Sequence, residues 1–180
     1  MRFGGCGAVN KHLSPRYVAG FFDGEGGIAI SGHTRIRNEP SVQRGRVASH
    51  TRWHRRVYVG NTNPSGLRKI QESFGGKLAL WRPWRPGNKP FWMLTWHASN
   101  GANFLRRILP HLIQKRQQAQ VYLAFQGTMH RVGQHPVPRP VQERRLLLYH
   151  HLFALNERGD GSHGYKPRLQ GIAHTPESRS

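Results

Sequence analysis

The stretch YVAGFFDGEGGIAISG, residues 17–32, decides the fold that we expect. Its first six residues are aromatic, apolar or small, and they run up to two carboxylates, Asp23 and Glu25, that are interleaved with glycines. An apolar alternation follows at Ile28 and Ile30. Glycines commonly end helices, whereas an alternation with a period of two is typical of strands. We therefore predict a helix that ends at the glycines and a strand that starts at Ile28, with both carboxylates at the junction.

The net charge of the chain points to a polyanionic partner. The 180 residues contain 28 Lys and Arg against 8 Asp and Glu, which gives a net charge of +20 with neutral histidines. Each Lys or Arg that neutralises a phosphate releases a condensed counterion, so nucleic acid is the first candidate. A membrane surface is a weaker one, because no stretch nears the ~18 apolar residues of a transmembrane helix and no basic amphipathic helix of the interfacial kind is present. We predict a nucleic-acid partner and no membrane.

Cysteine usage indicates a reducing compartment. Cys6 is the only cysteine, so neither an intrachain disulfide nor a zinc site built on cysteines can form. The N-terminal residues MRFGGCGAVNKH also lack the apolar run of a signal peptide. We expect an intracellular protein, and the sequence does not distinguish a chloroplast or mitochondrion from a prokaryotic cytoplasm.

The chain is expected to form one domain with loose ends. We predict a flexible N-terminal segment over residues 1–11, one domain over residues 12–157 and a disordered tail over residues 158–180. Ser14-Pro15 and Asn63-Pro64 each combine a helix cap with a proline at the first helical position. Together with periodicity and glycine signals, they predict a helix at 15–23, strands at 28–35 and 46–60 with a loop at 38–45 between them, a helix at 64–74, strands at 78–82 and 91–97, and helices at 102–109, 113–126 and 141–155. This order predicts an α+β fold with an antiparallel sheet that has one apolar and one basic face.

Residues 18–26, VAGFFDGEG, resemble the LAGLIDADG motif of the homing endonucleases position for position. Ala19-Gly20 match the motif outright, and Asp23-Gly24-Glu25-Gly26 corresponds to its acidic ending. A later segment, ILPHLIQKRQQAQ at residues 108–120, is similar to the proline, apolar stretch, lysine and Gln-Ala that the family carries at the start of a helix. The resemblance covers about residues 12–130, and the sequence shows no second copy of the motif.

This resemblance implies a fold and an activity. The implied fold is αββαββα, with a saddle-shaped antiparallel DNA-binding sheet and C-terminal helices. The implied activity is that of an intron- or intein-type homing endonuclease of the single-motif branch, which cuts both strands of a long, near-palindromic DNA site as a homodimer. The implied cofactor is Mg²⁺, and Mn²⁺ or Ca²⁺ could substitute for it in binding.

The resemblance also implies roles for individual residues. Glu25 would be the metal ligand, with the Gly24 carbonyl assisting, and Lys115 would polarise water or stabilise charge. Asn61 lies at the end of the second strand, where family members often carry a polar residue that orients water, although the basic residue that often follows is missing here. The residues implied at the dimer interface are Ala19, Gly20 and Asp23.

The scarcity of acidic residues agrees with a site that two chains share. Only Asp23, Glu25 and Glu39 precede Glu72, so one chain can hardly assemble a carboxylate cluster. Two copies with their motif helices packed together would bring two Glu25 side chains to a two-fold axis. The alternative interpretation, a polar turn after a helix, gains little from these carboxylates, because a helix C-terminus disfavours negative charge. For Lys115, the alternative is an ordinary phosphate-binding lysine.

Alternation in the first two strands places a set of polar side chains on one face of the sheet. A twisted antiparallel ribbon can enter the major groove, where donors and acceptors distinguish all four base pairs. We predict DNA contacts from this face and from the turn of the second hairpin. The predicted residues are Ser31, His33, Arg35, Arg52, His54, Arg56 and Tyr58 on the strands and Arg82 and Arg85 near the turn.

Aromatic residues gather around the second predicted hairpin. Large aromatic side chains usually pack in cores or across hairpins, so we interpret these tryptophans as core and hairpin packing residues rather than as platforms for base stacking. They are Trp81, Trp84, Trp92 and Trp96.

Two other functions remain open at this point. The same basic fold could serve an RNA-binding maturase that helps its host intron to fold, or a DNA-binding protein that has lost cleavage. The retained acidic residue Glu25 argues against a DNA-binding protein that has lost cleavage, and it does not exclude a maturase.

Overall fold

The computed structural model describes residues 12–36, 49–81, 87, 89–129 and 137–157. The loop expected at 38–45 and both predicted terminal segments lie outside these residues. Among the helices of the described part, none is long and apolar enough to cross a membrane.

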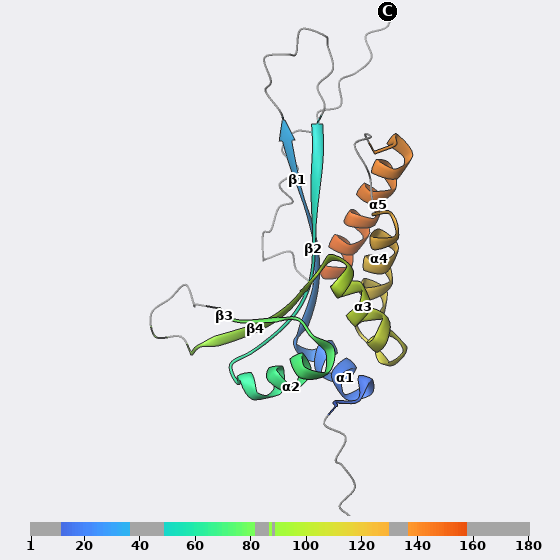
Figure 1. The fold of residues 1–180 in the computed structure, drawn as a ribbon. Coiled ribbons are helices and arrows are strands. Elements are labelled where there is room, and N and C mark those ends of the chain that lie inside the picture. The colour runs from blue at the N-terminus through green and yellow to red at the C-terminus, as the bar shows by residue number, and fades with distance from the viewer. Residues whose placement is uncertain (1–11, 37–48, 82–86, 88, 130–136, 158–180) are drawn as a thin grey trace, which may run out of the picture.

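The helices and strands follow one another in the predicted order, so the prediction of an α+β fold is confirmed (Figure 1). The elements are α1 (Pro15–Glu25), β1 (Gly26–Ile36), β2 (Ser49–Asn61), α2 (Pro64–Phe74), β3 (Lys77–Trp81), β4 (Phe91–His97), α3 (Ala98–Ile108), the 3₁₀ helix η2 (Leu109–His111), α4 (Arg116–Gly127) and α5 (Arg139–Asn156).

The four strands form one antiparallel sheet in the order β1-β2-β4-β3. β1 pairs with β2 along its whole length from Gly26 to Ile36, whereas β2 pairs with β4 only between Arg56 and Asn61. The helices gather on one side of this curved sheet, with α3, α4 and α5 beside β1 and β2 and with α2 beside the β3–β4 end (Figure 1). We call the side that carries the helices the inner face and the opposite side the outer face.

Strand alternation supplies the inner face with apolar side chains. Ile28 of β1 and Val57 of β2 are 4% and 0% exposed. Trp96 of β4 stacks on Phe104 of α3 with ring centroids 3.9 Å apart, and its indole N–H donates to the Phe74 carbonyl at 3.1 Å. A buried indole with a satisfied N–H adds a large apolar surface without a polar penalty. The core therefore lies between the sheet and the helices.

Several helix boundaries differ from the expectation, and α1, α3 and α4 show the differences nearest the site. α1 continues to Glu25, because its capping residue is Gly26, whose N–H donates to the Phe22 carbonyl, rather than an earlier glycine. α3 begins at Ala98, immediately after β4, instead of at residue 102. α4 begins at Arg116 instead of at residue 113, because the residues before it are bound to α1, as described below.

The interpretation of the tryptophans as packing residues is confirmed for Trp96, which is buried in the core, whereas Trp81 lies outside the core, opposite Phe91 on the hairpin. Trp81 is 54% exposed, because β3 is an edge strand and Trp81 lies on the outer face, where no helix of the described chain covers it. Trp92 is partly buried and packs against the core, and Trp84 lies outside the described residues.

Candidate functional site

Helix α1 delivers both motif carboxylates to its last turns. The Ser14 hydroxyl accepts the Tyr17 N–H at 3.3 Å and Pro15 is the first helical residue, so the predicted start of this helix is confirmed. At its end, a Cβ atom on Gly26 would lie 2.4 Å from the Phe22 ring. The chain therefore needs glycine here to turn from the helix into β1 without a clash.

Asp23 binds the end of α1 to the segment that precedes α4. Its carboxylate accepts the Ile113 N–H at 2.8 Å and the Lys115 N–H at 2.9 Å, and the Lys115 ammonium group donates to the Asp23 backbone carbonyl. Both Asp23 and Lys115 are 8% exposed. The helix dipole disfavours a carboxylate at the C-terminus of α1 and favours one just before the N-terminus of α4. The favourable interaction with α4 therefore offsets the unfavourable one with α1. We call these contacts the Asp23–Lys115 clamp.

Glu25 is an exposed carboxylate two residues beyond Asp23, at the last position of α1. Gly24 is exposed as well, and the carbonyl groups of a last helical turn have no partner within the helix. Carboxylate and carbonyl oxygens are the ligands that Mg²⁺ and Ca²⁺ prefer, so these residues fit a hard divalent cation in donor chemistry. The described residues contain no group of three His, Cys, Asp or Glu able to hold a metal. Water, phosphate or a second chain would therefore supply the remaining ligands.

Asn61 ends strand β2 at the same end of the sheet as the C-terminus of α1, since Gly26 pairs with Val59. Its side-chain oxygen accepts the Asn63 N–H at 2.9 Å, and Asn63 in turn caps α2 by accepting the Ser65 N–H at 2.9 Å. The Asn61 amide oxygen is thus part of the turn into α2.

Of the three residues implied at a dimer interface, only Gly20 lies on the surface of the protomer. Ala19 is 0% exposed in the core, and the Asp23 carboxylate is used in the clamp. The exposed side of α1 carries Tyr17, Gly20 and Gly24, whose spacing puts them on one helix face. Tyr17 is 57% exposed, and a Cβ atom at Gly20 or Gly24 would meet none of the described residues within 4 Å.

Ile113 extends this surface. It is 85% exposed, and its backbone N–H is bound to Asp23 in the clamp, so it lies against the end of α1. Sequence reasoning placed Tyr17 at the contact between two motif helices but missed Ile113, because no local signal marks it. We call Tyr17, Gly20, Gly24 and Ile113 the α1 face.

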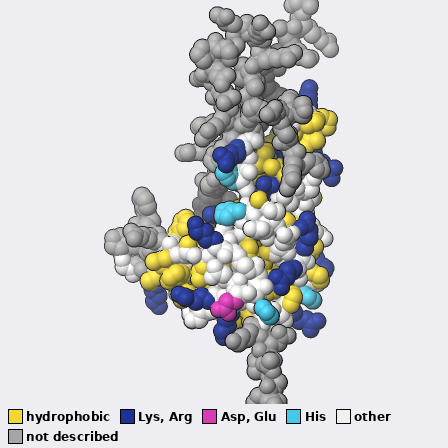
Figure 2. Space-filling model, in the orientation of Figure 1, with side chains coloured by type: hydrophobic (Ala, Val, Ile, Leu, Met, Phe, Trp, Pro, Cys, Tyr) yellow, Lys and Arg dark blue, Asp and Glu magenta, His cyan; other side chains and the backbone are white. Residues whose placement is uncertain are grey.

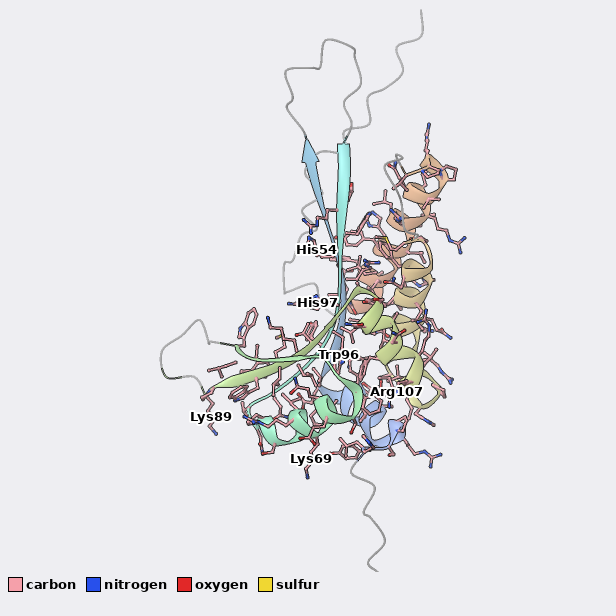
Figure 3. All side chains as sticks on the ribbon, viewed as in Figure 1. His54, Lys69, Lys89, Trp96, His97 and Arg107 are labelled. Atoms are coloured by element: carbon pink, nitrogen blue, oxygen red, sulfur yellow. The ribbon has the colours of Figure 1, made fainter. Side chains whose placement is uncertain are left out.

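The outer face of the β1–β2 ladder carries most of the predicted DNA-binding side chains. Ser31 lies opposite His54 in the ladder, and Arg52 and Arg56 follow on the same face of β2. In Figure 3, His54 and His97 lie on the side away from α4 and α5. The side chains of His33 and Arg35, and the whole of Arg82 and Arg85, lie outside the described residues.

Tyr58 and Arg56 are arranged by contacts on the outer face itself. A Cβ atom on Gly27 would lie 2.4 Å from the Tyr58 ring, so Tyr58 packs directly across this glycine. The Arg56 guanidinium lies 4.8 Å from the Tyr58 ring centroid, a distance typical of a cation–π contact. The ring thus limits the orientations of the arginine side chain before any ligand binds.

One arginine of β2 lies on the inner face instead. Arg55 donates to the Gln126 side chain at 2.8 Å, and Arg145 of α5, only 4% exposed, donates to the Thr128 hydroxyl at 3.1 Å. Burial lowers the pKa of both arginines, and the charge of Arg55 lowers the pKa of Arg145 further. Burial also raises the pKa of Tyr122 to about 12, although the positive charge of Arg55 opposes this shift. These residues join β2 to α4 and α5, away from the outer face.

Solved structures of homing endonucleases share this fold. The archaeal intron-encoded homing endonuclease I-Vdi141I, solved in complex with DNA, is similar with a TM-score of 0.58 at 18% sequence identity, over 81% of this chain and 86% of that chain. The homing endonuclease I-CvuI, solved with DNA in the presence of Mg, gives a TM-score of 0.54 at 18% identity, over 81% of this chain and 84% of that chain. The LAGLIDADG homing endonuclease I-LtrWI, bound to its target DNA, gives 0.51 at 16% identity, over 83% of this chain and 46% of that chain.

No protein-family model and no curated protein matches the chain. The similarity therefore lies in the arrangement of helices and strands: the chain has the fold of the LAGLIDADG homing endonucleases, as the sequence motif predicted.

Proposed function

We propose that this chain, which has the LAGLIDADG homing-endonuclease fold, is a metal-dependent, site-specific double-strand DNA endonuclease that acts as a homodimer. The observation that carries this proposal is the position of Glu25. It is the exposed carboxylate at the end of the motif helix, and the Asp23–Lys115 clamp holds a lysine ammonium group at the same helix end. Carboxylate and ammonium groups at one place suit the hydrolysis of a phosphodiester, in which negative charge develops on oxygen.

The charge and shape of the sheet support DNA as the substrate. The chain carries a net charge of +20, and Lys and Arg side chains are spread over the view in Figure 2 with little acidic surface between them. Arg52 and Arg56 lie on the outer face of a curved antiparallel sheet, where the sheet can follow a major groove. Arginine recognises guanine through two hydrogen bonds, and the Tyr58 contact prepares Arg56 for such a role.

A divalent cation, with Mg²⁺ as the first candidate, would be held by Glu25 and the Gly24 carbonyl. The ion would neutralise charge on phosphate oxygens and lower the pKa of a bound water. Lys115 would stabilise negative charge from its position at the Asp23 carbonyl. Asn61, at the same end of the sheet, would orient water or phosphate through its amide NH₂ group.

The α1 face supports the homodimer. Glycine inside a helix costs up to about 1 kcal/mol relative to alanine, yet no described residue of the protomer occupies the space beside Gly20 or Gly24. A second α1 helix packed at these glycines would explain them, because small residues let two helix backbones approach closely. Tyr17 and Ile113, 57% and 85% exposed, would be buried in the same contact. Each protomer would then contribute one Glu25 for one DNA strand.

Selection from a library of random DNA duplexes in the presence of Mg²⁺ tests the proposal. The purified protein is incubated with the library, and the ends of cleaved duplexes are sequenced. We expect a long target with two-fold symmetry and a staggered cut. Duplexes that are bound and never cut would contradict the enzymatic part of the proposal, and binding to structured RNA in preference to every duplex would contradict the choice of substrate.

A further inference from the structure

The outer face has an apolar end at the β3–β4 hairpin. Ala79 and Trp81 of β3 lie opposite Met93 and Phe91 of β4, and this parity puts all four on the outer face. Trp81 is 54% exposed, Ala79 is exposed, and the other two are half-buried. The Phe91 ring lies over Gly60 of β2, where a Cβ atom would be 2.2 Å from the ring. We call Ala79, Trp81, Phe91 and Met93 the apolar patch.

The apolar patch is not part of the core. The core side chains of β4, Leu94 and Trp96, alternate with the patch and point to the inner face. The described helices all lie on that inner side, so none of them covers the patch (Figure 1). Hydrophobic side chains are visible at the surface over the β3–β4 end (Figure 2). Contiguous apolar side chains at a surface, when rimmed by polar residues, are a feature of interaction sites.

The apolar patch continues the surface that we propose to bind DNA. Arg56 pairs with His97 across the β2–β4 ladder, and Tyr58 pairs with Thr95 on the same face. The next pair along this face is Gly60 with Met93, and Met93 belongs to the apolar patch. One sheet face therefore runs from arginines and histidine to aromatic and aliphatic side chains without a break.

We propose that the apolar patch reads the 5-methyl groups of thymines in the DNA target, an inference that rests on the proposed function. The major groove displays one apolar group, the C5 methyl of thymine, and apolar side chains contact it. The strongly positive chain supplies the attraction to the duplex, and the patch adds selectivity within each half-site. A duplex RNA lacks this methyl group and has a major groove too deep and narrow for side chains to read. The patch would thus also favour DNA over RNA.

Thymine-to-uracil exchange in the target tests this inference, because it removes the methyl group alone. The preferred duplex is obtained by selection in Ca²⁺, in which we expect binding, and each thymine is replaced in turn by deoxyuridine. We expect the dissociation constant to rise about fourfold at each thymine that the patch contacts, which corresponds to burial of one methyl-sized group. Elsewhere in the target the exchange should change affinity less than about 1.5-fold.

Trp81→Ser and Leu80→Ser form a matched pair of variants. Leu80 is the neighbour of Trp81 on β3 and is 48% exposed, close to the 54% of Trp81, but it pairs with Trp92 on the inner face. We expect Trp81→Ser to abolish the discrimination between thymine and uracil at one position at least. Leu80→Ser should keep this discrimination, and thermal denaturation shows whether both variants are folded. Should Trp81→Ser fail to fold, Met93→Ser takes its place.

The outcomes separate the inference from the proposed function. Target binding that no thymine-to-uracil exchange weakens, a selected target without thymine, or equal effects of the two variants would overturn the inference and leave the proposed endonuclease intact. A protein that binds no duplex DNA at all would overturn the proposed function, and the inference with it.

Discussion

Replacement of Asp23 should destabilise the fold, although this residue lies in the most recognisable motif of the chain. Its carboxylate accepts two backbone N–H groups, from Ile113 at 2.8 Å and from Lys115 at 2.9 Å, in a site where Asp23 is 8% exposed. A hydrogen bond to a charged group is worth about 1.5–3 kcal/mol. Asp23→Ala loses both bonds and relieves a small unfavourable interaction with the C-terminus of α1, so we expect a net loss of about 3 kcal/mol in the free energy of unfolding.

In a protein of this length, about 3 kcal/mol corresponds to a fall in Tm of about 6–12 °C. Thermal and urea denaturation measure this loss of stability. All variants are compared at the same protomer concentration, because the stability of a dimer depends on concentration. Asp23→Asn keeps one acceptor oxygen, so its loss in the free energy of unfolding should be about half that of Asp23→Ala. Glu25→Gln is the matched control: this carboxylate lies two residues away on the same helix and is exposed, so its Tm should stay within about 2 °C. An Asp23→Ala variant as stable as the control would refute the structural role of the clamp.

Three further predictions concern the α1 face, the outer face and a buried tyrosine. Gly20→Leu should give monomers in sedimentation experiments. Gly66→Leu, a change at another exposed helix glycine with open space beside it, should leave the dimer intact. Dimers of both variants would contradict the proposal that the α1 face is the dimer interface. Gly27→Ala should weaken DNA binding roughly tenfold, because its Cβ would displace the Tyr58 ring, and an unchanged dissociation constant would count against that contact. Because burial raises the pKa of Tyr122 from about 10 to about 12, its contribution to stability should be complete below pH 10 and lost as the pH rises from 10 to 12; a free energy of unfolding that is flat over this range would contradict its burial.

The fold was largely predictable because its local signals agree with one another. Ser14-Pro15 and Asn63-Pro64 mark the starts of α1 and α2, and both side chains accept the expected backbone N–H groups. The period-two alternation predicted which side chains of β1 and β2 would face the helices. Arg55 breaks this alternation, and it is accommodated because Gln126 of α4 lies over it, a partner 71 residues away that no local pattern reveals.

The arrangement of the site was less predictable, because it depends on contacts between distant segments. The clamp joins residues 90 and 92 positions apart, and it explains both the late start of α4 and the burial of Lys115. The implied interface residue Ala19 faces the core. The side of α1 that packs on α3 determines which residues of the helix stay exposed for a partner, and this packing depends on distant segments. The exposure of Trp81 follows from strand order, which places β3 at the edge of the sheet.

Comparison of Glu25→Gln with the unchanged protein on the selected duplex tests the central claim most directly. The exchange removes the negative charge of the one carboxylate that we assign to the metal and leaves the clamp and the outer face untouched. We expect the variant to bind the duplex with a dissociation constant within about twofold of the unchanged protein. Its Mg²⁺-dependent cleavage should fall on the order of a thousandfold, since a metal contributes several kcal/mol to such a transition state. Cleavage by Glu25→Gln at the unchanged rate would contradict the account.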